Sequence, residues 1–334
     1  MLLGFFAVFS LSLLFMLLFK QQAVRLGFVD IPNHRSSHVV HTPSGAGIAL
    51  YFAVAIGAYL TPVYCMEQYM WVCVATLLVF LTGVVDDRYD IPPKAKFVVL
   101  AFSAFLLSFH DILITDVGTF FGIHISLGMM ALPFTVFAVV GLSNAVNLID
   151  GIDGLAGSIS IVILSTFWFI GFYNQDMMMA LLSMVFIAAV LGFLFFNWHP
   201  ASIFMGDSGS LVLGFVISVL AIKALAYLPA VSVLFIVALP VIDTIVVMVR
   251  RKRMGRSIFS PDRCHLHHIL LRFFGGNVRR TVLFLVVLQA VYAITGIYVQ
   301  NMTDSGGSLI LFGLNAFLIY MATNAIRKKE NYSC

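Results

Sequence analysis

The sequence predicts an all-α, polytopic membrane protein with about eleven transmembrane helices. Hydrophobic residues make up 61% of the 334-residue chain and charged residues only 10%, and the mean hydropathy is +1.03. Soluble domains are far more polar than this. The apolar runs are continuous and near the ~20 residues that cross a bilayer, whereas the strands of a membrane barrel alternate over about ten residues. Both a soluble domain and a barrel are therefore excluded.

The eleven predicted spans follow one another along the whole chain. They cover residues 2–19, 47–64, 70–85, 97–114, 131–148, 155–173, 178–196, 210–228, 230–249, 281–299 and 307–326. The first run lacks the basic segment and the small-residue cleavage site of a signal peptide, so it is expected to stay as a helix. Pro240 predicts a kink in the ninth span. We expect residues 1–334 to form one integral membrane domain.

The segment between the fourth and fifth spans, residues 112–127, mixes β-branched and aromatic residues with Gly118 and Gly122. This composition predicts a short β-hairpin at the membrane surface.

Basic residues predict the orientation. All nineteen Lys and Arg residues except Lys223 share one side if that side holds the C-terminal tail and the loops beginning at Lys20, Asp86, Asp150, Asn197 and Arg250. The positive-inside rule makes that side cytoplasmic, with the N-terminus and the hairpin outside and the C-terminus inside. The basic clusters adjoin helix ends and no nucleic-acid-binding domain is recognisable, so nucleic acid is not an expected partner.

The first polar motif closes the third span. Asp86 and Asp87 are adjacent, and Lys94 and Lys96 follow shortly after in what the pattern predicts to be a loop. Adjacent carboxylates repel each other unless a metal, a phosphate network or a shared proton compensates them. A solvated polar cap on the helix end is the alternative.

The second motif is NAVNLIDGIDGLAG, at the end of the fifth span. Asn144, Asn147 and Asp150 recur every three residues, which places them on one face of a helix. Two glycines then end the helix and put Asp153 into a turn beside them. Carboxylate and amide oxygens are ligands that Mg²⁺ prefers. A polar helix hairpin without metal remains the alternative.

The third motif, FMGDSGS, precedes the eighth span. Its glycines let backbone N–H groups approach an anion at a helix N-terminus, and Asp207 could complete a metal site. Ser208 or Ser210 could cap the helix instead. The segment is no Walker A loop, because the Gly-Lys-Ser/Thr ending is missing.

The fourth motif, SPDRCHLHH, lies in the loop 250–280 and holds Arg263, His265, His267 and His268. Its spacing matches none of the usual structural zinc patterns. A cationic clamp on a diphosphate fits better, because guanidinium groups bind phosphate in bidentate fashion, and it favours a nucleotide-sugar donor. Asp243, inside the ninth span, is expected to hold the kinked helix to a neighbour.

These four motifs, in this order and separated by helices, resemble the polyprenyl-phosphate N-acetylhexosamine-1-phosphate transferase family. This is glycosyltransferase family 4; the similarity is greatest to its WecA-like branch, which is related to MraY. The resemblance extends from the segment PNHRSSH, which begins at Pro32, to the eleventh span.

The resemblance implies transfer of a sugar 1-phosphate from a UDP-N-acetylhexosamine, by default UDP-GlcNAc, to undecaprenyl phosphate with release of UMP. This is the first membrane step of O-antigen or related envelope polysaccharide synthesis, at the cytoplasmic face of the bacterial inner membrane. The implied cofactor is Mg²⁺ or Mn²⁺. The implied metal ligands are Asn147 and Asp207, the catalytic carboxylates Asp86, Asp87, Asp150 and Asp153, and the substrate contacts Lys94, Lys96, Asn144, Arg263, His265, His267 and His268.

Several alternatives stay open at this point. Ser44 and Ala46 depart from the family's usual Pro-x-Gly-Gly run, and Cys264 adjoins the first histidine, so a 6-deoxy UDP-HexNAc donor is a second possibility. Direct attack by the lipid phosphate and a covalent aspartyl-phosphate route are both compatible with the motifs. A homodimer is compatible with the sequence. A transporter is the rival from another class, although transporters place their ionisable groups near the bilayer midplane.

Overall fold

The computed structural model describes residues 2–30, 41–60, 70–257, 264–302 and 304–329. They form helices and two small antiparallel sheets. The chain divides into two compact units. The first unit comprises Met1–Thr115 and Leu127–Tyr227, and the second comprises Asp116–Ser126 and Leu228–Cys334.

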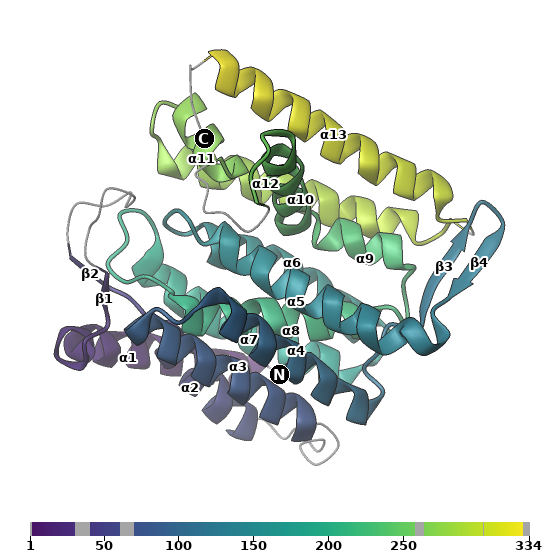
Figure 1. The fold of residues 1–334 in the computed structure, drawn as a ribbon. Helices are drawn as coiled ribbons and strands as arrows, with labels where there is room; N and C mark the ends of the chain where they lie inside the picture. Colours follow the sequence, from purple (N-terminus) through teal and green to yellow (C-terminus); the bar gives the residue numbers. More distant parts are fainter. Residues whose placement is uncertain (1, 31–40, 61–69, 258–263, 303, 330–334) are drawn as a thin grey trace. The chain divides into compact units, whose positions relative to one another are not determined.

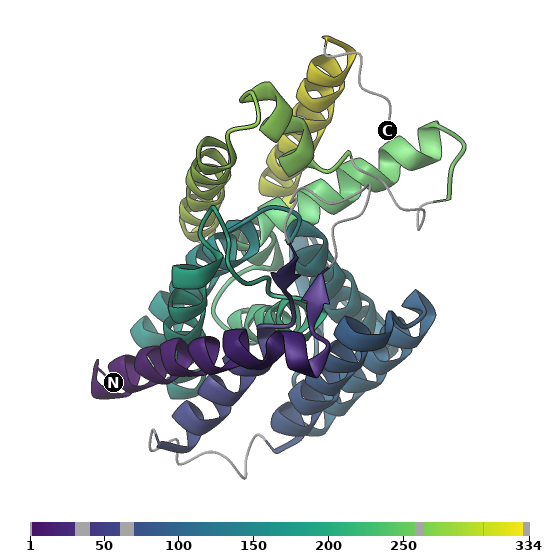
Figure 2. The same ribbon diagram turned by 90° about the vertical axis from the view of Figure 1, so that its left-hand side faces the viewer.

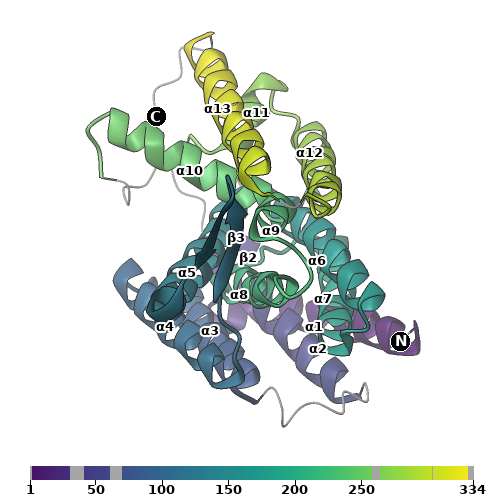
Figure 3. The ribbon, with the colours of Figure 1, turned by 90° about the vertical axis from the view of Figure 1, so that its right-hand side faces the viewer.

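The first unit consists mainly of long helices packed side by side (Figure 1). Its helical elements are α1 (Leu2–Leu26), α2 (Gly47–Leu60), α3 (Met70–Tyr89), α4 (Pro93–Leu106), η2 (Leu107–His110), η3 (Gly128–Met130), α5 (Ala131–Ile149), α6 (Leu155–Tyr173), α7 (Met177–Asn197) and α8 (Asp207–Ala224). Figure 3 shows α8 nearly end-on at the centre of this unit, with α2, α3, α5 and α6 around it. Nearly every residue of α8 is buried. The first turn of this central helix carries Asp207.

A small sheet follows α1 (Figure 2). Strands β1 (Val29–Asp30) and β2 (Thr42–Pro43) pair antiparallel. Strand β2 and the chain after it are bound to the segment before α8, because Phe204 N donates to Pro43 O at 2.8 Å and Ala46 N donates to Phe204 O at 3.1 Å. At Gly47 a Cβ atom would lie 2.0 Å from Gly209 N, so only glycine permits this approach of α2 to α8.

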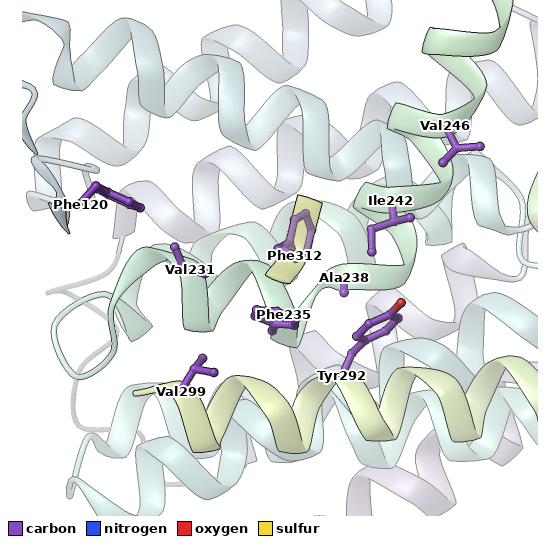
Figure 4. Close-up of a cluster of buried hydrophobic side chains, with 9 residues drawn as sticks. All are labelled: Phe120, Val231, Phe235, Ala238, Ile242, Val246, Tyr292, Val299 and Phe312. Atoms are coloured by element: carbon purple, nitrogen blue, oxygen red, sulfur yellow. The ribbon is translucent and has the colours of Figure 1, made fainter. Parts of the chain in front are cut away.

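The second unit is built from β3 (Asp116–Phe120), β4 (Ile123–Ser126), α9 (Ala230–Ile236), α10 (Ala238–Arg253), α11 (Leu266–Phe273), α12 (Val278–Val299) and α13 (Gly306–Lys329). Figure 4 shows its buried apolar cluster: Phe120, Val231, Phe235, Ala238, Ile242, Val246, Tyr292, Val299 and Phe312. The ring of Phe235 meets that of Phe312 edge-on, with 5.3 Å between ring centroids.

Strands β3 and β4 pair antiparallel within the segment where a hairpin is expected. The turn of this hairpin is bound to the chain before α13, because Asp304 accepts hydrogen bonds from Phe121 N at 3.1 Å and Gly122 N at 2.8 Å. Phe120 of β3 reaches the buried cluster of the second unit.

The kink predicted in the ninth span is confirmed, but the helix breaks at Val237, three residues before Pro240, with 87° between α9 and α10. An unbroken helix would need a hydrogen bond from residue 240 to Ile236 O, and proline has no N–H to make it. The fully buried side chain of Gln289, on α12, bonds to backbone groups on both sides of the break. Its Oε1 accepts from Leu239 N at 3.0 Å and its Nε2 donates to Ile236 O at 2.7 Å.

Among the described residues, nine helices are long and apolar enough to cross a membrane, and the bent pair α9–α10 makes ten if counted as one span. The described part of α2 is shorter. The protein is thus a helical multi-pass membrane protein. Each of the eleven predicted runs contains a helix, while the number and direction of crossings stay predictions.

Candidate active site

Two carboxylates and one lysine meet in the first unit. The Nζ atom of Lys96 lies 2.7 Å from Asp86 Oδ2 and 2.7 Å from Asp207 Oδ2. Asp86 comes from the last turn of α3, Lys96 from the first turn of α4, and Asp207 from the first turn of α8. Lys96, Asp86 and Asp207 are named the carboxylate centre here; their side chains are 21%, 10% and 25% exposed. Two motifs far apart in the sequence are therefore brought together at helix ends.

The prediction that Lys94 and Lys96 lie in a loop is wrong. Helix α4 begins at Pro93, because proline suits the first turn of a helix, where its missing N–H costs nothing. The first turn holds the Lys96 side chain against both carboxylates. Lys94, two residues earlier and so on another face of the helix, is exposed.

Asp87 caps the central helix α8. Its Oδ1 accepts from Asp207 N at 2.6 Å and its Oδ2 from Ser208 N at 3.1 Å, two N–H groups that have no partner within the helix. Position 206 is a glycine with φ of 71°, and a Cβ atom there would lie 2.6 Å from the Asp87 carboxylate oxygens. A carboxylate at a helix N-terminus is also favoured by the helix dipole.

The expectation that Ser208 or Ser210 caps α8 is therefore wrong. Ser210 Oγ donates to Gly206 O at 2.9 Å and accepts from Asn147 Nδ2 at 3.0 Å. This second bond brings the Asn147 side chain of α5 to the first turn of α8. Asn144, one turn earlier on α5, is partly buried.

The turn between α5 and α6 carries Asp150 and Asp153. Burial, and then the negative charges of Asp207, Asp87 and Asp153, raise the pKa of Asp150 to about 7. Asp150 thus shares an electrostatic environment with all three acidic motifs. A group of carboxylates with this excess of negative charge attracts cations.

His199 completes this turn, and sequence reasoning missed it. Its Nδ1 atom lies 2.7 Å from Asp153 Oδ2. The backbone N–H of Ala201 donates to the same oxygen at 3.0 Å, and Asn197 Oδ1 accepts from Gly154 N at 2.9 Å. The available signal was the polar run Asn-Trp-His-Pro after the seventh span, which interrupts an otherwise apolar stretch.

The oxygen donors at these helix ends are of the type that Mg²⁺ prefers. Asp207 and Asp86 supply carboxylate oxygens, and Asn147, whose Nδ2 bonds Ser210 Oγ at the start of α8, also carries an amide oxygen. The described ranges contain no group of three or more His, Cys, Asp or Glu placed to hold a metal ion. The cation between the two carboxylates is instead the ammonium group of Lys96. In chemical type, the carboxylate and amide oxygens of Asp86, Asp207 and Asn147 still fit a divalent cation.

The histidine motif lies in the second unit. His265 Nδ1 pairs with Asp243 Oδ2 at 2.8 Å, and Asp243 Oδ1 accepts from Leu266 N at 2.7 Å. Asp243 therefore binds α10 to the start of α11, in agreement with its expected structural role. Arg250 Nη2 donates to Thr323 Oγ1 of α13 at 3.0 Å. Where they are described, residues 250–280 include the end of α10, all of α11 and the start of α12. Arg263 lies outside the described residues.

His265, His267 and His268 form a row of rings, with centroid separations of 5.7 Å and 4.2 Å. Both ring nitrogens of His267 are buried, and neither has a partner among the described residues. Burial, and then the charge of His268, hold the pKa of His267 well below its usual range. His267 is therefore neutral at pH 7, with one nitrogen able to donate and one to accept a hydrogen bond.

Comparison with known proteins adds independent information. Residues 69–225 match the family model described as glycosyl transferase family 4. The chain is 34% identical over 315 residues to a probable undecaprenyl-phosphate N-acetylglucosaminyl 1-phosphate transferase of Bacillus subtilis (strain 168), covering 91% of this chain and 86% of that protein. It is 32% identical to the undecaprenyl-phosphate alpha-N-acetylglucosaminyl 1-phosphate transferase of Yersinia pestis and 30% identical to that of Escherichia coli (strain K12), each over 94% of this chain and 88% of the relative.

Proposed function

Because the chain belongs to glycosyl transferase family 4, we propose that it transfers N-acetylglucosamine 1-phosphate from UDP-N-acetylglucosamine to undecaprenyl phosphate. In this reaction an oxygen of the lipid phosphate attacks the sugar-linked phosphorus of the donor, the diphosphate bond breaks, and UMP leaves. The observation that carries the proposal is the carboxylate centre, where Lys96 bridges Asp86 and Asp207 at the ends of three helices. Phosphoryl transfer needs this combination of charge neutralisation and positioning.

The two adjacent aspartates have different tasks in this proposal. Both oxygens of Asp87 accept backbone N–H groups of α8, so Asp87 positions Asp207 and does not act as a base. Asp86 accepts from Ile91 N at 3.0 Å and holds Lys96, whose ammonium group can turn from the carboxylates to a phosphate oxygen.

We propose that Asp150 accepts a proton in this reaction, since both oxygens of Asp87 already accept backbone N–H groups. Its pKa, raised to about 7, lies near the second pKa of a phosphate monoester, which is about 6. A carboxylate with such a pKa can take a residual proton from the lipid phosphate as that phosphate attacks. In this proposal the lipid phosphate attacks directly, without a covalent aspartyl-phosphate.

Asn147 and Asp207 are the residues proposed to hold Mg²⁺ or Mn²⁺. A divalent ion supplies Lewis-acid neutralisation of the diphosphate oxygens when it is bound. Asn147 is suited to this role because Ser210 fixes its amide at the first turn of α8, the turn that carries Asp207.

The histidine row of the second unit is proposed to bind the donor, as part of a recognition segment spanning residues 250–280. His265 is held by Asp243, and His267 keeps two buried ring nitrogens to offer to polar groups of the donor. We propose that Arg263 adds a phosphate contact, because guanidinium groups bind phosphate in bidentate fashion.

The proposed location is the bacterial inner membrane, with the active site on the cytoplasmic side and a role in O-antigen or related envelope polysaccharide synthesis. The distribution of basic residues supports this orientation. A transporter is disfavoured, because Asp86 and Asp207 occupy terminal turns of their helices, whereas transporters bind substrate near the bilayer midplane.

The test is UMP release by the purified protein in detergent, supplied with UDP-GlcNAc, undecaprenyl phosphate and Mg²⁺. We expect release that requires all three components. UDP-N-acetylfucosamine and UDP-N-acetylquinovosamine, supplied in parallel, determine whether a 6-deoxy donor is used instead. Absence of UMP release with every UDP-sugar would contradict the proposed function. A phosphorylated protein trapped without acceptor would contradict direct attack.

A further inference from the structure

His199 is an ionisable side chain of the first unit that the proposed reaction leaves without a task. It follows α7, and its Nδ1 atom lies 2.7 Å from Asp153 Oδ2. The imidazole is 41% exposed, while the Asp153 side chain is 18% exposed. The ring is thus partly exposed, and the carboxylate that holds it is more buried.

The surrounding segment holds this pair in place. Asn197 is almost completely buried and bonds both Gly154 N at 2.9 Å and Ile203 O at 2.8 Å. Trp198 packs on the same turn, where a Cβ atom added to Gly154 would lie 3.2 Å from the indole ring. Ala201 N adds a second hydrogen bond to Asp153. An isolated surface ion pair would have no such framework, so the orientation of the ring is fixed by the fold.

The pair also lies among charges that a phosphate would meet. Asp153 contributes to raising the pKa of Asp150, as do Asp207 and Asp87, so the turn lies beside the carboxylate centre. Phosphate groups approaching these carboxylates are repelled unless cationic donors receive them. A protonated imidazole carries a proton on each ring nitrogen, so a ring that is held through Nδ1 can donate a hydrogen bond from Nε2 to an anion.

On the basis of the proposed function, we propose that His199 is a phosphate-binding residue of this site and that Asp153 is the positioning residue that orients it. The phosphate belongs either to the nucleotide sugar or to the lipid acceptor. Both present the same oxygen chemistry to the ring. Asp153 then acts through His199 and has no separate contact with the reacting atoms.

The test is the variant H199N, whose amide can still donate to Asp153 but which lacks the second ring nitrogen. KM for UDP-GlcNAc, KM for undecaprenyl phosphate and kcat are measured separately, together with the melting temperature. We expect one KM to rise about tenfold or more, as for loss of a charge-assisted hydrogen bond, with an unchanged melting temperature. The KM that rises identifies which phosphate His199 binds. D153N should raise the same KM, and the double variant should be no worse than H199N.

The hairpin offers a matched control, because His124 Nε2 lies 2.6 Å from Asp116 Oδ2 in another exposed histidine–aspartate pair. H124N should keep both KM values. Wild-type kinetics in H199N, or a lower melting temperature with both KM values unchanged, would overturn the proposal and leave His199 as a structural clamp.

Equilibrium binding of each substrate, which needs no turnover, separates the two hypotheses. A wild-type protein that binds both substrates without releasing UMP contradicts the proposed function alone, whereas equal affinities in H199N and wild type contradict the role of His199. Failure of the wild type to bind either substrate overturns both.

Discussion

Neighbouring residues of the same type have distinct roles in this protein. Asp86 faces a lysine, whereas Asp87 faces the backbone N–H groups at the start of α8. The sequence predicted that the pair is important but could not assign different roles to the two side chains. The separation depends on where α8 starts, and that is a tertiary contact between segments 120 residues apart.

Removal of the Asp87 cap should cost stability. D87A leaves two N–H groups of a buried helix without partners, and we expect a loss of about 1–2 kcal/mol in the free energy of unfolding, as for other helix caps. D87N keeps one acceptor and should lose less. Thermal unfolding in detergent measures the difference. D90N, at an exposed position, is the control and should be near neutral; equal melting temperatures for D87A and wild type would contradict the cap.

The raised pKa of Asp150 predicts a pH-dependent cost to stability. The unfolded chain loses this proton near pH 4, whereas the folded protein holds it to about pH 7. Stability should therefore fall as pH rises between these values, with the full penalty above pH 7. In protein stripped of divalent ions, D150N should melt at a higher temperature than wild type at pH 8 and at the same temperature below pH 4. A difference independent of pH would contradict the prediction.

At the scale of elements, the α9–α10 bend shows what a sequence pattern can and cannot predict. Pro240 predicts a kink, because proline lacks the N–H group that would bond to the carbonyl four residues earlier. The residue that makes the bend tolerable, Gln289, lies about 50 residues further on and bonds the backbone on both sides of Val237. Its role follows from the packing of α12 on α9, which local periodicity does not contain.

Replacement of Gln289 by leucine should therefore destabilise the second unit. The substitution keeps the approximate size of the side chain but leaves Leu239 N and Ile236 O buried without partners. Each unsatisfied group costs about 1–3 kcal/mol. We expect a clear loss in melting temperature for Q289L and little change for N315L, whose exposed amide bonds only within its own helix. Equal effects of the two substitutions would contradict this account of the bend.

At the scale of the whole molecule, hydropathy was the strongest signal in the sequence. Each apolar run contains a helix, because the composition and length of a run determine whether it can cross a bilayer as a helix. Helix ends were less predictable: α4 begins at Pro93 and α8 at Asp207, before the apolar runs do. Those extra turns carry Lys96 and Asp207, so the carboxylate centre could be predicted as a set of residues but not as a geometry.

The predicted orientation can be tested by labelling single cysteines in a cysteine-free background. Lys94→Cys, at the exposed start of α4, should react with a membrane-impermeant maleimide only after the cells are opened. Met129→Cys, which is 94% exposed in the native side chain, should react in intact spheroplasts. The positive-inside rule gives this expectation, and the reverse pattern would invert the proposed topology.

The central claim is that the carboxylate centre performs phosphoryl transfer. The most direct measurement is the initial rate of Mg²⁺-dependent UMP release by D207N, compared with D176N. Asp176 is the matched control, because it also pairs with a lysine, Lys223, at 3.2 Å and also lies at a helix start. We expect D207N to lose about a hundredfold or more, as for removal of a group that stabilises transition-state charge, and D176N to stay near the wild-type rate. Equal rates for the two variants would contradict the claim.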